Sequence, residues 1–157
     1  MGTQAAVIKA AELCRAEEGF RSKPYLCPAG VPTIGYGSTR YPDGRRVQLT
    51  DPPCTKEQAE EWLQHELSLC AIDAIKASPV LLKYESALAA VVDFIYNLGI
   101  GRYRSSTFKR RVDALDWAGA AVECKKWVRG GGKILPGLVR RRGVEAGWLL
   151  ACLSSRE

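Results

Sequence analysis

A turn-rich stretch of about residues 20–50 constrains the fold of this chain more than any other feature. It contains two turn signals, Pro28-Ala29-Gly30 and Pro42-Asp43-Gly44, of the kind that separates short strands. The strand-like segments beside them are residues 23–27, 31–36 and 46–49. This pattern predicts a small antiparallel sheet of two or three strands. Because helical patterns flank it on both sides, the sequence predicts an α+β fold, in which sheet and helices occupy separate parts of the molecule.

Helical patterns precede and follow the predicted sheet. Apolar residues recur at helical spacing from Gln4 to Glu18, and Gly19 then provides a residue suited to a helix end. Thr55 and Gln58 have the spacing of a capping box at the start of a long helix. Further helices are predicted around residues 88–95, from Ser106, from Asp116 to Val128 and, after the Gly130-Gly131-Gly132 loop, over about residues 137–150.

These elements predict a single domain over residues 1–157 with two lobes. The small β lobe spans about residues 20–50, the helical part comprises residues 1–19 and 51–157, and the long helix joins the two. With 46% hydrophobic residues, the chain can bury a substantial core. A cleft between two such lobes is a common place for a ligand site.

Charge and composition narrow the classes of function. The net charge of +6 predicts attraction to polyanions, which include nucleic acids, membrane surfaces and the anionic polymers of cell walls. No apolar run approaches the roughly 18 residues of a membrane span, and no signal-peptide pattern is seen, so we expect neither stable membrane insertion nor export by a cleaved signal peptide. Six scattered cysteines and one histidine do not have metal-ligand spacing, so no metal and no cofactor is predicted.

Glu18 is the candidate general acid. A carboxylate in the last turn of a helix faces the negative end of the helix dipole, and neighbouring Glu17 adds a like charge. Both effects favour the protonated carboxyl group that a general acid requires. The alternative interpretation is that both glutamates are solvated at a frayed helix end.

Cys27 and Thr33 flank the first turn of the predicted hairpin. They could face one another across paired strands and point toward the end of the first helix. Taken alone, a cysteine such as Cys27 is more often a buried apolar residue, and a threonine such as Thr33 is more often an ordinary strand residue.

Taken together, these segments resemble the phage lysozyme or endolysin family, the muramidases of glycoside hydrolase family 24. The matching stretches are Glu18-Gly19-Phe20-Arg21, residues 24–30, Thr33-Ile34-Gly35-Tyr36-Gly37, and residues 94–99, 105–108 and 127–145. The family's catalytic set is a glutamate, an aspartate or cysteine nine residues later and a threonine six residues beyond, which Glu18, Cys27 and Thr33 fit. The departure is the cysteine, where many relatives have aspartate.

The resemblance implies a lysozyme-like fold and a bacteriolytic hydrolase that cleaves the β-1,4 bond between N-acetylmuramic acid and N-acetylglucosamine. In an inverting mechanism, Glu18 protonates the leaving oxygen while Cys27 and Thr33 hold or activate a water on the opposite face. Direct attack by Cys27 with retention of configuration is the alternative. The implied biology is lysis of the host by a monomer that reaches peptidoglycan from the host cytoplasm through a holin-type pore.

Two further residues are candidates for substrate binding. Asn97 offers an amide that can donate to and accept from acetamido groups, although it could instead cap a helix end. Arg141, within the run Arg140 to Arg142, is expected to orient Glu18 or to contact the glycan. The alternative for this run is an exposed basic face.

Three rival functions remain open at this point. A cysteine hydrolase would pair Cys27 with His65, the chain's one histidine. A nucleic-acid-binding module is suggested by Arg140 to Arg142, although 17 acidic residues are interspersed with the cations and no nucleic-acid-binding motif is present. A lytic transglycosylase would use the same glutamate and form an anhydro sugar without needing Cys27 or Thr33.

Overall fold

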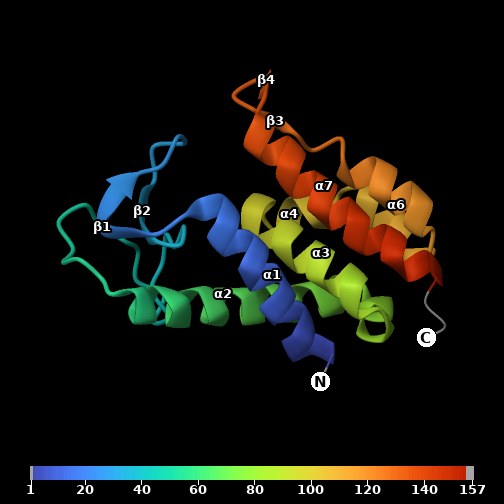
Figure 1. The fold of residues 1–157 in the computed structure, drawn as a ribbon, viewed down its shortest axis with the longest axis horizontal. Helices are drawn as coiled ribbons and strands as arrows, with labels where there is room; N and C mark the ends of the chain where they lie inside the picture. Colours follow the sequence, from blue (N-terminus) through green and yellow to red (C-terminus); the bar gives the residue numbers. More distant parts are fainter. Residues whose placement is uncertain (1, 155–157) are drawn as a thin grey trace.

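A computed structural model of the chain describes residues 2–154 and has a β lobe and a helical lobe (Figure 1). Helix α1 (Gly2–Glu18) leads into an antiparallel pair of strands, β1 (Arg21–Leu26) and β2 (Pro32–Gly35). The long helix α2 (Lys56–Ala77) then runs from the β lobe into the helical lobe. Its 22 residues span about 33 Å, enough to support both lobes. The predicted α+β architecture, with a small β lobe and a larger helical lobe joined by a long helix, is confirmed.

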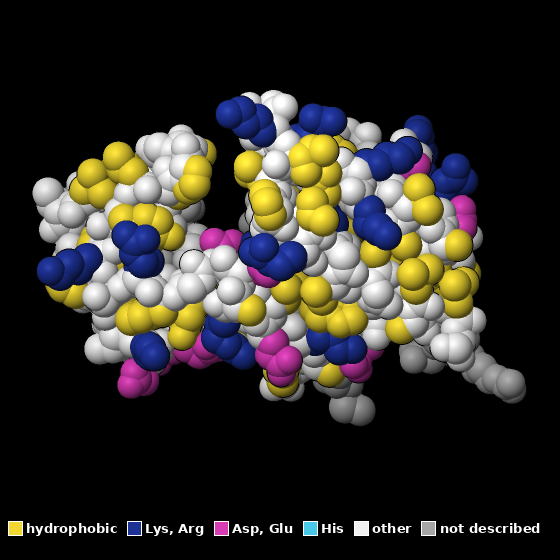
Figure 2. Space-filling model, turned by 45° about the horizontal axis from the view of Figure 1, so that its top comes forward, with side chains coloured by type: hydrophobic (Ala, Val, Ile, Leu, Met, Phe, Trp, Pro, Cys, Tyr) yellow, Lys and Arg dark blue, Asp and Glu magenta, His cyan; other side chains and the backbone are white. Residues whose placement is uncertain are grey.

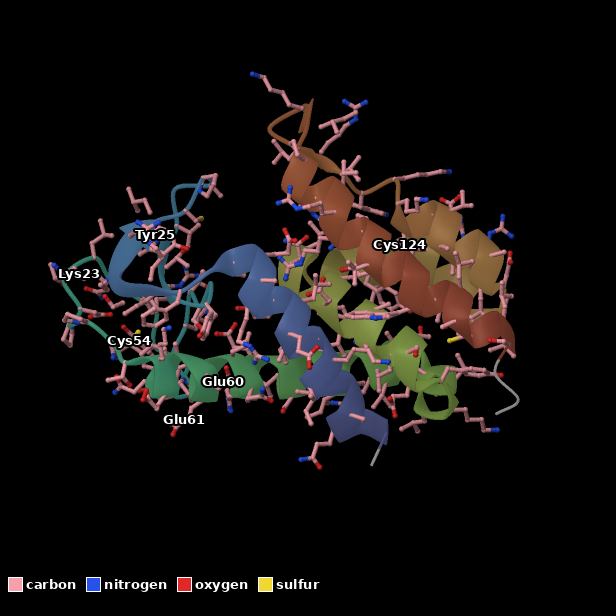
Figure 3. The ribbon with its side chains drawn as sticks, in the orientation of Figure 1. Lys23, Tyr25, Cys54, Glu60, Glu61 and Cys124 are labelled. Carbon is pink, nitrogen blue, oxygen red and sulfur yellow. The ribbon has the colours of Figure 1, made fainter. Side chains whose placement is uncertain are left out.

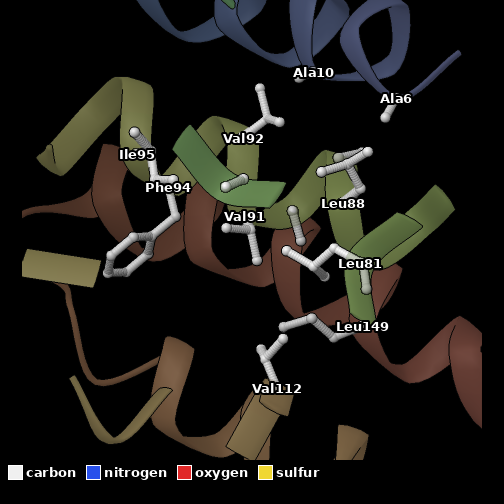
Figure 4. Packing of buried hydrophobic residues seen from close by; sticks show 14 of the residues in the cluster. Ala6, Ala10, Leu81, Leu88, Val91, Val92, Phe94, Ile95, Val112 and Leu149 are labelled. Carbon is white, nitrogen blue, oxygen red and sulfur yellow. The ribbon is translucent and has the colours of Figure 1, made fainter. Parts of the chain in front are cut away.

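The helical lobe is built around α3 (Glu85–Leu98). The other elements of this lobe are η1 (Pro79–Lys83), α4 (Ile100–Arg104), α5 (Thr107–Asp113), α6 (Trp117–Cys124), the hairpin strands β3 (Arg129–Gly130) and β4 (Lys133–Ile134), α7 (Pro136–Ala151) and η2 (Cys152–Ser154). Every residue of α3 from Ala87 to Ile95 is buried. Figure 4 shows side chains of α1 packed on one side of α3 and Leu149 of α7 on another. This packing holds the end of α1 and the start of α7 near one another. Among residues 2–154, none of the helices combines the length and the hydropathy of a membrane-spanning segment.

The predicted helix caps are confirmed. Thr55 and Gln58 form a reciprocal capping box at the start of α2. The Ser106 side chain accepts a hydrogen bond from the Lys109 backbone at the start of α5, and Asp116 caps α6 in the same way. These bonds satisfy backbone N–H groups that the first turn of a helix leaves free, which explains why the helices begin where the sequence indicates.

Three predicted elements differ from the structure. The helix predicted from Asp116 to Val128 ends at Cys124 as α6. Residues 46–49 do not form a third strand; Arg46 makes a single bridge to Arg40, and Val47 is buried with Ile34 in the small core of the β lobe. Of residues 130–132, predicted as a loop, Gly130 instead ends β3, and Gly131 and Gly132 form the turn of the β3–β4 hairpin. Gly131 and Gly132 have φ values of +59° and +80°, and two successive positive φ angles suit a tight hairpin turn.

Candidate active site

A cleft of about 490 Å³ lies between the lobes and contains four of the predicted residues. Glu18, Cys27, Thr33 and Asn97 all line it. Figure 2 shows the hollow between the lobes, with acidic side chains at its floor. A second cavity, of about 430 Å³, lies between aromatic rings and prolines of the β lobe, and none of the predicted residues lines it. The residues predicted to act in catalysis and one of those predicted to bind substrate therefore line the same cleft.

Glu18 is the last residue of α1, and its carboxyl group packs against the backbone of the β lobe. A Cβ atom at Gly37 would lie 2.8 Å from Glu18 Oε1, and Gly37 has a φ of +88°. A side chain at this position would therefore displace the carboxyl group and strain the backbone. The glycine that follows β2 thus allows the end of α1 to reach the cleft.

Arg141 fixes the orientation of Glu18. Its Nη1 donates to Glu18 Oε2 at 2.7 Å, while Nε and Nη2 donate to the two carboxylate oxygens of Asp93 at 2.8 and 2.9 Å. This two-pronged contact suits the planar guanidinium group and holds it in one orientation. Arg141 is only 3% exposed. Of the two roles predicted for it, this geometry favours orienting Glu18 over contacting the glycan, and it rules out the exposed basic face for this residue.

Asp93 lies at the centre of a buried charged network. Cys14 Sγ donates to its Oδ1 at 3.1 Å, and Glu145 is hydrogen-bonded to the same carboxylate. Burial acts to raise the pKa of Asp93, but the hydrogen bond with Glu145 and the charge of Arg141 outweigh it and keep the pKa low. Burial and the nearby Asp93 raise the pKa of Glu145 instead. Asp93 therefore carries the negative charge that holds Arg141.

Sequence reasoning missed Asp93 and Glu145. Asp93 did leave a signal, because it is the one charged residue in the otherwise apolar stretch from Ala87 to Ile95. A buried charge of this kind requires a partner. The partner, Arg141, lies 48 residues away in sequence, so no local pattern identified the pair.

Cys27 and Thr33 lie at the turn end of the β1–β2 hairpin, although not as a directly paired position. Thr33 pairs with Tyr25, whereas Cys27 follows the end of β1 and donates its backbone N–H to Val31. A hydrogen bond from the Val31 backbone lowers the pKa of the Cys27 thiol against the opposing effect of burial, and Thr33 adds a smaller lowering. The thiolate is thus easier to form here than in an isolated cysteine.

The last turn of α3 contributes Tyr96 and Asn97 to the cleft. The Tyr96 hydroxyl donates to the Tyr36 carbonyl at 2.8 Å and so ties the helical lobe to the β lobe. Asn97 Oδ1 is buried without a hydrogen-bond partner among the described residues, and Gly99 occupies the C-cap position. This favours sugar binding over helix capping for Asn97, and its role stays a prediction.

His65 is exposed and does not line the cleft, so the Cys27–His65 pairing loses its support.

Glu66, on α2, is a further cleft residue that the sequence did not indicate. Burial raises its pKa to about 7; the Ser38 hydroxyl opposes this and the charge of Glu18 adds to it. At neutral pH, this side chain is therefore divided between a carboxylic acid and a carboxylate.

The raised pKa of Glu66 predicts a pH-dependent stability. Between its ordinary pKa of 4.5 and the raised value of about 7, the folded protein binds more protons than the unfolded chain, so this group's contribution to stability falls as the pH rises. We expect the stability of Glu66→Gln relative to the parent to increase by about 2 kcal/mol between pH 5 and pH 8. Urea unfolding at both pH values measures it; an equal difference at the two would contradict the prediction.

Comparisons with known proteins agree with this architecture. The family model for phage lysozyme matches residues 15–145. The chain is 30% identical to the endolysin of Acyrthosiphon pisum secondary endosymbiont phage 1 over 138 residues, covering 85% of this chain and 89% of that protein. The endolysin from Escherichia coli O157:H7 phage FAHEc1 superposes with a TM-score of 0.80 at 33% identity, covering 90% of each chain. The muramidase domain of SpmX from Asticaccaulis excentricus gives a TM-score of 0.70 at 29% identity, covering 90% of this chain and 94% of that domain. By sequence and by fold, this chain belongs to the phage lysozyme family.

Proposed function

We propose that this chain is a peptidoglycan hydrolase of phage-mediated host lysis, which cleaves the β-1,4 bond between N-acetylmuramic acid and N-acetylglucosamine. Membership of the phage lysozyme family supports the activity. The observation that carries the assignment of the site is that Glu18, held by Arg141 at 2.7 Å, shares one cleft with Cys27 and Thr33. Release through a holin-type pore stays a prediction of the resemblance.

Glu18 supplies the proton in the proposed reaction. Because Oε2 accepts the hydrogen bond from Arg141, Oε1 is the oxygen free to carry the transferable proton. The proton passes to the glycosidic oxygen as its bond to the sugar C1 breaks. Arg141 then stabilises the carboxylate that remains.

Cys27 and Thr33 act on the water in this scheme. The oxygen of the water attacks C1 from the face opposite the leaving oxygen, Cys27 accepts a proton from it, and the Thr33 hydroxyl helps to hold it. The lowered pKa of Cys27 increases the fraction of thiolate, which is the form that accepts this proton, at a given pH. The stereochemical result is inversion.

Product analysis separates this proposal from its nearest rival. Hydrolysis adds one water to the cleaved glycan, whereas a lytic transglycosylase forms an anhydro sugar and adds none. We expect mass spectrometry of digested peptidoglycan to show reducing ends, and NMR of fresh products to show the inverted anomer. Anhydro products would contradict hydrolysis, and a retained anomer would contradict the water-activating role of Cys27.

The pH profile tests Cys27 as the base. Because the Val31 hydrogen bond lowers the thiol pKa from 9.0, the activity of the parent should rise with pH and level off below the pH of an ordinary thiol. We expect Cys27→Ser to lower kcat by about 100-fold. Cys27→Asp should remain active and move the rising limb of the pH profile to acid pH, since the ordinary pKa of an aspartate is about 3.9. A rising limb that stays in place in Cys27→Asp would exclude Cys27 as the base.

A further inference from the structure

An acidic side chain outside the proposed catalytic set enters the cleft from α2. Glu66 lines the same cavity as Glu18 and Asn97, and the reaction above does not use it. We propose that Glu66 is a substrate-binding residue, whose protonated carboxyl group donates a hydrogen bond to an acetamido carbonyl oxygen of the glycan. This inference rests on the proposed peptidoglycan substrate, in which both sugars are N-acetylated.

Unused hydrogen-bonding capacity is the first observation behind this proposal. Glu66 Oε1 is buried and has no hydrogen-bond partner among residues 2–154, and the same holds for Asn97 Oδ1. The Ser38 hydroxyl lies near enough to act on the Glu66 carboxyl but outside good hydrogen-bond geometry. Buried polar atoms in native proteins are almost always bonded, so unpartnered ones beside a cleft indicate a ligand that completes them.

The surroundings of Glu66 explain why it would act as a donor. The titratable groups that act on it or respond to its charge are Glu18 from α1, Cys70 on α2 and Tyr96 from α3, none of which is cationic. Glu66 forms no ion pair within the described chain, and Arg141 is engaged by Glu18 and Asp93. Burial in such an environment disfavours the carboxylate, and the pKa is raised to about 7. A protonated carboxyl group can donate a hydrogen bond, whereas a carboxylate can only accept.

The partner chemistry follows from this donor. An acetamido group presents a carbonyl oxygen as acceptor and an N–H as donor. Glu66 can serve the carbonyl oxygen, and Asn97, in the same cleft, offers an acceptor to an N–H. Two side chains of one cleft, one a donor and the other an acceptor, would therefore recognise acetamido groups and favour N-acetylated over unmodified sugars.

The experiment compares Glu66→Gln, Glu66→Ala and the parent from pH 5 to pH 9. It measures kcat and KM on purified peptidoglycan and the Kd for a soluble N-acetylglucosamine oligomer. Glutamine keeps a permanent donor, so Glu66→Gln should bind as the parent does at pH 5 and about tenfold more tightly than the parent at pH 9. Glu66→Ala should bind about tenfold more weakly at pH 5, with kcat little changed. The control is Glu61→Gln, because Glu61 is exposed on α2 and points away from the body of the molecule (Figure 3).

The outcomes separate binding from a purely structural role. If Glu66→Gln keeps the parent's pH dependence of Kd, or if folded Glu66→Ala binds the oligomer like the parent, the proposal is overturned. If Glu66→Ala does not fold, the comparison between Glu66→Gln and the parent decides alone. A parent protein that binds the oligomer with the expected pH dependence but leaves peptidoglycan intact would contradict the proposed hydrolysis and not the role of Glu66.

Discussion

Glu18→Gln is expected to lower kcat on peptidoglycan by about 10²- to 10⁴-fold, the range that general acid catalysis contributes. The glutamine has the shape of the glutamic acid and its amide oxygen can still accept the hydrogen bond from Arg141 Nη1. It cannot transfer an acid proton to the glycosidic oxygen. The loss should therefore fall on kcat and leave KM nearly unchanged, because the cleft keeps its shape. Release of soluble fragments from purified peptidoglycan measures both constants.

The matched control for this variant is Glu12→Gln. Glu12 is exposed on the same helix, α1, more than one turn before Glu18. It changes the net charge by the same amount, so a general charge effect on binding to the anionic wall would appear in both variants. If Glu18→Gln cleaves peptidoglycan as fast as Glu12→Gln, Glu18 is not the general acid.

Asp93→Asn should cost about 3–5 kcal/mol of unfolding free energy, which is the usual cost of removing one partner from a buried ion pair. The substitution keeps the size of the side chain but leaves the buried guanidinium of Arg141 without the carboxylate that binds it at two points. Arg141 would then hold Glu18 less firmly. We therefore also expect a lower kcat at a temperature where the variant remains folded. Urea unfolding and the kinetics on peptidoglycan measure the two effects.

An exposed ion pair provides the comparison for Asp93. Lys109 Nζ lies 2.6 Å from Asp113 Oδ2 on the surface of α5. Asp113→Asn therefore removes the same charge from a solvated pair, and it should cost about 1 kcal/mol or less of unfolding free energy. Equal stabilities for Asp93→Asn and Asp113→Asn would contradict the buried network. Arg141→Lys gives the second readout for positioning, since a lysine keeps the charge but not the two-pronged geometry. It should lower kcat more than it raises KM.

The predictions for Glu18 and Asp93 concern two residues of one site that act in different ways. Glu18 is the group that would touch the scissile bond, whereas Asp93 acts on it through Arg141 as a positioning residue. Because Glu18 is tied to Arg141 and packs against Gly37, its carboxyl group is held by both lobes at once. A change in lobe packing would therefore alter the proposed chemistry even where it leaves the cleft residues intact.

Features that depend only on residues close together along the chain could be predicted from the sequence. The helix caps at Thr55, Ser106 and Asp116 need only residues within a turn of themselves, and they appear where the pattern predicts. Glu18, Cys27 and Thr33 lie within one helix end and one hairpin, so a short segment brings them into the same cleft. Their individual roles stay predictions until variants are measured.

Tertiary packing alone decided the rest. Arg141 and Glu18 lie 123 residues apart, and only the packing of α1 and α7 against α3 brings them together around Asp93. In the sequence, Glu66 cannot be distinguished from the other charged residues of α2. Its raised pKa arises from burial and from the charge of Glu18, which depend on the folded structure. Val47 could have continued a third strand, but it packs into the small core beneath β2 instead. The physical reason is common to all three. Burial and charge pairing depend on which surfaces pack together in the folded chain, and the spacing of residues along the sequence does not predict this packing.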